Sequence, residues 1–275
     1  MRHSTLQVLN DTSLFDSRQL LPRSVLACTM RAWAHWLKEN LQPFPKLIRE
    51  FGFGVVVVRM NVRYERPFNF FTADEFEVDC AISVRQKRHL LHGDMQFMNG
   101  DERFAHIQCA MRPLAIDHDS DLGAMPSRVD GAVLEMFQPD EIANDAVERP
   151  LRKTLAGLAE ARVVALATRE IRIFRHDAEA ADQWSYIELI ANASSAREEM
   201  IVAAGPELQQ AMQAGLAEPL VDLEVEIDRP LFLFDAAEIH TTAYRDARSL
   251  TFVHIYRSNL GGSHEHATVV ERFAL

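Results

Sequence analysis

The feature that most limits how this chain can fold is a weak repeat of one of its own segments. The ten residues 66–75 and the ten residues 229–238 are identical at five positions, at a constant offset of 163. The same offset aligns the helical pattern at 22–38 with that at 185–201. This agreement predicts a duplicated domain, and we expect its function to arise where the two copies meet.

Downstream landmarks keep nearly the same offset. Asn99-Gly100 and Gly261-Gly262 are both turn sequences. Each is followed by a stretch of alternating polar and apolar residues that contains Ala105 in the first copy and Ala267 in the second. The three landmarks occur in the same order, which favours duplication over chance similarity.

Composition excludes several classes of function. The 275 residues suffice for two units of about 130 residues each. The formal net charge of −11 argues against a nucleic-acid partner, because phosphate binding needs a basic surface. Residues 1–5 lack the apolar run of a signal peptide, and no long apolar run predicts a membrane span. We therefore expect a cytoplasmic protein.

No segment predicts a metal site. Cys28, Cys80 and Cys109 lie in apolar patterns without C-x-x-C spacing, so we expect reduced core residues. The acidic run 117–121 is typical of a solvated linker and lacks the spacing of a calcium loop. In 264–266 two histidines flank a glutamate, but no third ligand is apparent, and we expect an exposed strand edge.

The first copy predicts a strand, a loop, a helix and a meander. The loop is 10–16, and the helix begins at Pro22, a residue favoured at the first helical position. Apolar residues then recur every three to four positions as far as Trp36. Alternation and turn residues predict the strands 6–9, 51–61, 76–85, 90–98 and 105–111.

Between the copies the periodic pattern weakens. The stretch 117–149 contains an acidic cluster and several prolines, which indicates an exposed connector. We therefore expect a first unit at 1–116, a connector at 117–155 and a second unit at 156–275.

The second copy repeats the order of the first. Its helix is expected to begin with a capping box. In this motif the Ser185 side chain accepts from the backbone N–H three residues on, and the Glu188 side chain reaches back to the backbone N–H of Ser185. The small side chains of 191–196 let a sheet approach this helix closely. The predicted strands are 161–174, 221–227, 237–245, 249–257 and 267–273, with a loop at 175–182. The whole is an α+β architecture.

These patterns resemble the hotdog fold of acyl-CoA and acyl-ACP thioesterases and dehydratases. The second unit is the closer match: 174–177 place an aspartate after the first strand and before the helix, and 251–257 resemble the hairpin strand. The G-H-x-N-N segment of that family is replaced by 178–183. Because single hotdogs dimerise, the resemblance implies a tandem, double hotdog in which each long helix is wrapped by an antiparallel sheet.

Double-hotdog proteins of polyketide-type biosynthesis, such as the leinamycin acyltransferase/decarboxylase group, are a more specific resemblance. That group implies a tyrosine acyl acceptor, for which Tyr64 stands in the matching strand. The second copy has Ile227 or Asp228 at this place, so the two halves are not chemically equivalent.

The resemblance implies thioester chemistry. Such chemistry needs donors for the oxyanion, which a helix N-terminus offers, and a carboxylate or activated hydroxyl. We expect Asp177 and Tyr64 to be catalytic. Substrate-binding residues are expected in the loops and helices of both copies: His176, Ser185, Tyr186, Asp16 and His35.

The leading hypothesis is a thioesterase, a hydrolase acting on acyl-CoA or on an acyl carrier protein in fatty-acid or polyketide-type metabolism. One alternative is an acyltransferase, with or without decarboxylation, that works through a tyrosine. Another is a non-catalytic scaffold that binds acyl carriers. No cofactor is implied beyond the coenzyme A or phosphopantetheine of the substrate, and a homo-oligomer of double hotdogs is an open expectation. The chain has no G-x-S-x-G elbow and no Gly-rich phosphate loop.

Overall fold

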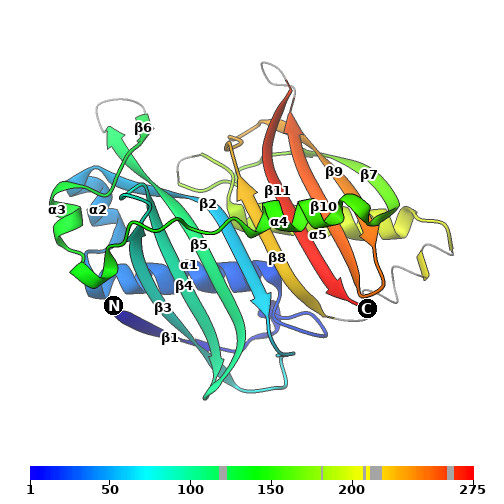
Figure 1. Ribbon diagram of the computed structural model, residues 1–275, viewed down its shortest axis with the longest axis horizontal. Coiled ribbons are helices and arrows are strands. Elements are labelled where there is room, and N and C mark those ends of the chain that lie inside the picture. Colours follow the sequence, from blue (N-terminus) through cyan, green and yellow to red (C-terminus); the bar gives the residue numbers. More distant parts are fainter. Residues whose placement is uncertain (118–122, 181, 207–208, 211–218, 259–262) are drawn as a thin grey trace. The chain divides into compact units, whose positions relative to one another are not determined.

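The computed structural model describes residues 1–275 except 118–122, 181, 207–208, 211–218 and 259–262. The chain divides into two compact units, unit 1 at Met1–Glu148 and unit 2 at Arg149–Leu275. Each unit combines one long helix with an antiparallel sheet (Figure 1).

In unit 1 the sheet order is β1-β3-β4-β5-β2, with the short strand β6 added to β5. All the pairings of these strands are antiparallel. The elements are β1 (His3–Leu9), η1 (Thr12–Leu14), α1 (Pro22–Asn40), α2 (Phe44–Phe51), β2 (Phe53–Tyr64), β3 (Glu75–Arg85), β4 (Leu90–Asn99), β5 (Glu102–Asp117), β6 (Gly123–Pro126), α3 (Gly131–Glu135) and η2 (Pro139–Glu141).

Unit 2 repeats this arrangement in the order β7-β9-β10-β11-β8. The strand that precedes the long helix again lies at one end and the strand that follows it at the other, so the duplication predicted from the sequence is confirmed. The elements are α4 (Pro150–Gly157), η3 (Leu158–Glu160), β7 (Arg162–Arg172), α5 (Tyr186–Ala203), β8 (Leu220–Ile227), β9 (Ala236–Arg245), β10 (Ser249–Ser258) and β11 (His264–Ala274).

Equivalent backbone hydrogen bonds fix the alignment of the two units. The N–H of Glu65 donates to the carbonyl of Phe104 at 2.8 Å, and the N–H of Asp228 donates to that of His266 at 2.9 Å. The donors are 163 residues apart and the acceptors 162. The start of the sequence repeat therefore corresponds to one structural position in each unit, whereas the strand registers further on align Phe76 with Ala237, at an offset of 161.

The core of each unit lies between its long helix and its sheet. On α1 the buried apolar residues include Val25, Ala32 and Trp36, as the spacing predicts. On α5 the small residues Ala193 and Ala196 are buried. The other face of the unit 2 sheet is partly covered by α4, where Leu151 packs on Val253 and Val270 of β10 and β11.

The predicted strands and long helices are confirmed, with ends shifted by a few residues. The helices α2, α3 and α4 were not predicted. The stretch 117–149 is not the uniformly exposed connector that its prolines indicated, because side chains within it are buried in unit 1: Val129, Val133, Phe137 and Glu141. Gly261-Gly262 and most of the acidic run 117–121 lie outside the described residues.

Two other expectations can be compared directly with the structure. Cys28, Cys80 and Cys109 are buried free thiols, as expected, and burial raises the pKa of Cys28 to about 11. His266 does not lie at an exposed edge, because β11 pairs with both β8 and β10 and the side chain is buried. Among the described residues, no helix is long and apolar enough to cross a membrane.

Candidate active site

The loop between β7 and α5 in unit 2 carries the aspartate singled out from the sequence. Asp177 closes a turn: its Oδ2 accepts from the N–H of Phe174 at 2.9 Å, and its own N–H donates to the Phe174 carbonyl at 2.9 Å. The side chain is only 14 % exposed. His176 is 79 % exposed, with its Nε2 3.4 Å from Oδ1 of Asp177. The Asp177 carboxylate therefore has a clear part in shaping the loop.

The first turn of α5 follows directly. Ser185 is the N-cap, as predicted, but its Oγ accepts from the N–H of Ile187, two residues on, at 3.3 Å, and not from the third. The N–H of Ser185 donates to the carbonyl of Asp177 at 2.7 Å, which ties the loop to the helix start. Tyr186 is the first helical residue and is buried.

A second carboxylate, Glu179, lies at this helix start and was missed by the sequence reasoning. Desolvation raises its pKa, against hydrogen bonds from the side chain of Ser185 and the backbone N–H of Tyr186 that lower it. The residue as a whole nevertheless remains exposed to solvent. Glu179 thus combines a raised pKa, contact with a helix N-terminus and access from outside.

The repeat offset was the signal that could have found Glu179. In unit 1, Asp16 is its counterpart at an offset of 163, and the two share a hydrogen-bond pattern. The N–H of Asp16 donates to the carbonyl of Gln19 at 3.0 Å, and that of Glu179 donates to Gln183 at 2.7 Å. Oδ1 of Asp16 accepts from two backbone N–H groups of its own loop, those of Arg18 and Gln19.

The other two predicted residues of unit 1, Tyr64 and His35, have partners within their own unit. Tyr64 is buried at the end of β2, and its hydroxyl donates to the carbonyl of Leu20 at 3.1 Å. Its counterpart in unit 2 is Ile227, one of the two residues expected there. His35 on α1 is partly exposed, with its Nε2 3.3 Å from Glu39 one turn on.

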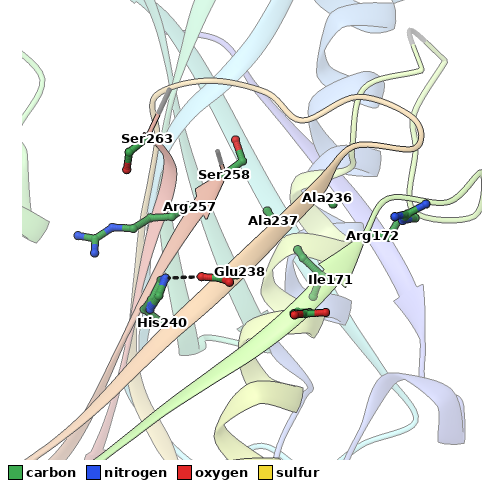
Figure 2. A pocket seen from close by; sticks show the side chains of 10 residues that line it. Ile171, Arg172, Ala236, Ala237, Glu238, His240, Arg257, Ser258 and Ser263 are labelled. Atoms are coloured by element: carbon green, nitrogen blue, oxygen red, sulfur yellow. Dashed lines mark ion pairs between the residues drawn. The ribbon is translucent and has the colours of Figure 1, made fainter. Parts of the chain in front are cut away.

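A pocket of about 810 Å³ opens in unit 2 at the end of β7, where Ile171 and Arg172 line it just before the chain enters the loop of Asp177 and Glu179 (Figure 2). Neither of these two carboxylates is among its lining residues. Two polar side chains of the pocket have partners: Nε2 of His240 lies 3.1 Å from Glu238, and Arg257 pairs with Glu265 at 2.6 Å. The lining residues come from β7, β9 and β10 and from the position just before β11: Glu170, Ile171, Arg172, Ala236, Ala237, Glu238, His240, Arg257, Ser258 and Ser263.

Unit 2 also contains a charged cluster in its core that the sequence reasoning missed. Glu271 on β11 is fully buried and accepts from the Ser194 hydroxyl of α5 at 2.8 Å. Arg197 pairs with it at 2.6 Å, and Nε2 of His254 lies 3.4 Å away. No group of three metal-ligating side chains suited to a metal ion occurs in the described parts of the chain.

The comparisons with known proteins agree with this architecture. No protein-family model and no curated protein matches the chain. Solved structures match over nearly its whole length. A proposed oleoyl thioesterase from Lactobacillus plantarum superposes with a TM-score of 0.72 at 10% identity, covering 100% of this chain and 97% of that one.

Two further structures cover 99% of this chain and 98% of their own. They are a 12:0-ACP thioesterase from Umbellularia californica, with a TM-score of 0.67 at 12% identity, and an acyl-ACP thioesterase from Bacteroides thetaiotaomicron, with 0.63 at 11%. At these identities the likeness establishes the fold alone. Together with the repeated strand order, it shows that the chain has the α+β double-hotdog fold expected from its sequence.

Proposed function

We propose that this protein hydrolyses an acyl thioester of coenzyme A or of an acyl carrier protein, with its active site in unit 2. The observation that carries the proposal is Glu179, a carboxylate bonded to the first turn of α5 and open to solvent. The full-length fold likeness to acyl-ACP thioesterases supports the substrate class.

The chemistry follows from the two groups that meet at the helix start. Glu179 is the general base: it takes a proton from the water whose oxygen attacks the acyl carbonyl. Desolvation raises its pKa, which makes the carboxylate a stronger base near neutral pH than an ordinary glutamate. The positive end of the α5 dipole lies at the same place and stabilises the developing oxyanion.

Asp177 is the alternative base within the same loop. Its Oδ2 accepts the N–H of Phe174, and only a small part of its side chain is exposed. These contacts favour a positioning role in which Asp177 holds the loop that presents Glu179.

The test is thiol release from a panel of acyl-CoAs and acyl carrier proteins by the wild type, Glu179→Gln and Asp177→Asn. We expect Glu179→Gln to lose about 10²-fold or more in kcat with little change in KM or stability. Asp177→Asn should lose both activity and thermal stability. Full activity in Glu179→Gln, with loss in a stably folded Asp177→Asn, would make Asp177 the base; no release by the wild type would reject hydrolysis.

Membership of the leinamycin-type group would instead make the protein an acyltransferase that uses Tyr64. The buried Tyr64 hydroxyl donates to Leu20, a contact that an acyl acceptor would have to give up. Tyr64→Phe in the same panel separates the two: hydrolysis should persist, whereas transfer through the tyrosine would vanish. Binding of acyl carrier protein without any turnover would favour the third hypothesis, a non-catalytic scaffold.

A further inference from the structure

Ser258 and His266 form a buried pair at one end of the unit 2 sheet. Oγ of Ser258 lies 2.6 Å from Nε2 of His266, and the two residues are 4 % and 6 % exposed. His266 is the extra residue of a β-bulge, because Tyr256 pairs with Ala267 while Arg257 pairs with Glu265. The bulge interrupts the alternation of β11 and so permits this contact.

Ser258 is only 4 % exposed, but it is one of the residues that line the pocket of unit 2. Figure 2 shows Ser258 at the end of β10, with Ala237 of β9 between it and Ile171 of β7. Ser258 is therefore among the residues next to which a substrate in this pocket would lie. The hydroxyl also has a partner able to accept its proton, and this combination marks an activated nucleophile.

Burial favours the uncharged form of His266, the form that a base requires, and its buried Nδ1 has no hydrogen-bond partner among the described residues. Desolvation lowers the pKa of His266, and it outweighs the opposing effects of the carbonyls of Arg229 and Pro230 and of the Asp235 carboxylate. The imidazole is therefore neutral at neutral pH. Asp235 supplies a negative charge that stabilises the imidazolium once the proton has arrived.

Unit 1 has no serine–histidine pair at the equivalent positions. The counterparts of Ser258 and His266 are Asn99 and Phe104. Phe104 stacks on Phe68 with ring centroids 4.0 Å apart and meets Phe76 edge-on at 5.6 Å. In unit 1 aromatic rings thus occupy this end of the sheet.

Unit 2 has small or polar residues at the same positions. Phe76 pairs with Val8 in unit 1, and its counterpart Ala237 pairs with Ile171 in unit 2. Replacing two phenylalanines by Ala237 and His266 removes one ring and puts an imidazole in place of the other. The pocket and the Ser–His pair therefore arise from the same divergence between the copies.

We propose that Ser258, with His266 as its base, takes the acyl group from the thioester before water does. This rests on the proposed function. The Ser258 oxygen bonds to the thioester carbonyl carbon while its proton passes to Nε2 of His266. The carbon–sulfur bond breaks, the thiolate takes the proton from His266 and leaves as the thiol, and an acyl ester remains on Ser258. Water activated by Glu179 then hydrolyses that ester to the free acid and restores the serine.

The first experiment uses a fluorophosphonate probe on the intact protein, with intact-mass measurement and peptide mapping. We expect one adduct on Ser258 that is lost in Ser258→Ala and reduced at least tenfold in His266→Gln. Ser263→Ala is the matched control, because Ser263 lines the same pocket and has no hydrogen bond to a histidine among the described residues, and it should label normally. Labelling elsewhere, or none in a protein that retains thioester hydrolysis, overturns the proposal.

The second experiment mixes acyl-CoA with Glu179→Gln, in which the acyl ester should persist because its hydrolysis is blocked. An acyl mass on Ser258, absent in the Ser258→Ala/Glu179→Gln double variant, is expected. Hydrolysis undiminished in Ser258→Ala would overturn the role of Ser258 and leave the proposed function intact. Probe labelling of Ser258 in a protein that cleaves no thioester would reject the proposed function and keep the nucleophile.

Discussion

Nη1 of Arg197 lies 2.6 Å from Oε2 of Glu271 in the core of unit 2, between α5 and β11. Arg197 stands eleven residues after the first residue of α5, the place that Trp33 holds in α1. The strand registers pair Glu271 with Leu223 and its unit 1 counterpart Cys109 with Met60. Unit 2 thus has a buried ion pair at the positions where unit 1 has the apolar side chains of Trp33 and Cys109.

Removing one charge of this pair should destabilise unit 2 strongly. In Glu271→Gln the Arg197 guanidinium keeps its desolvation cost but loses its buried partner and retains the exposed Glu198, so we expect a loss of about 3 kcal/mol in the free energy of unfolding. The double variant Arg197→Met/Glu271→Leu should recover much of that loss, since it leaves no buried charge. Urea unfolding monitored by circular dichroism gives both values. Equal losses in the single and double variants would contradict this account.

The lowered pKa of Glu271 predicts that the folded protein loses stability in acid. Burial alone raises its pKa, but Arg197, His254 and Ser194 outweigh burial and lower it to about 2. The folded state therefore binds this proton less tightly than the unfolded state, whose glutamates titrate near 4.5. The stabilisation is complete above that pH and is lost as the pH falls towards 2. Thermal melts from pH 6 to 2.5 should show a steeper decline for the wild type than for Arg197→Met/Glu271→Leu.

In unit 1, Glu141 anchors the N-terminal strand. It is fully buried and accepts from the backbone N–H of Arg2 at 2.9 Å and from its Nη2 at 2.6 Å, as well as from the N–H of Gln138 at 2.8 Å. Glu141→Gln should cost about 2 kcal/mol, because hydrogen bonds to a charged group are lost. Asp145→Asn, which removes an exposed partner of Arg85, should cost less than about 1 kcal/mol. Comparable losses in the two variants would show that Glu141 has no anchoring role.

Ser185→Ala should change both stability and the pH profile. It removes the cap that accepts from the N–H of Ile187, at a cost of about 1 kcal/mol. It also removes a hydrogen bond that lowers the pKa of Glu179, so this pKa should rise further. Because a base acts when deprotonated, the acid limb of kcat/KM should move to higher pH. Ser195→Ala, on the exposed side of α5, is the control and should leave the limb in place.

Ala237→Phe tests whether the difference between the copies creates the pocket. The substitution restores to unit 2 the ring that Phe76 supplies in unit 1, next to Ser258. We expect KM for long acyl-CoAs to rise at least tenfold and probe labelling of Ser258 to fall, with a melting temperature close to that of the wild type. Unchanged KM and labelling would show that substrate does not occupy this pocket.

The sequence by itself determined the duplication, the two long helices and most strands. The duplication is recognised from the constant offset of 163. The helices and strands depend on local patterns, such as apolar spacing on α1, the proline at its first position and the Ser185 cap on α5. Such patterns act within a few residues, so they can be recognised without a tertiary structure. The loop that carries Asp177 was found for the same reason.

Only the tertiary structure decided which side chains meet. The carboxyl of Glu179 reaches the first turn of α5 because the loop closes on itself, and no local pattern marks that contact. His266 turns inward because a bulge shifts the register between β10 and β11. Arg197 and Glu271 are 74 positions apart in the sequence and meet only when helix and sheet pack. Strand register and helix–sheet contact depend on long-range packing, which therefore determines the chemistry of this site.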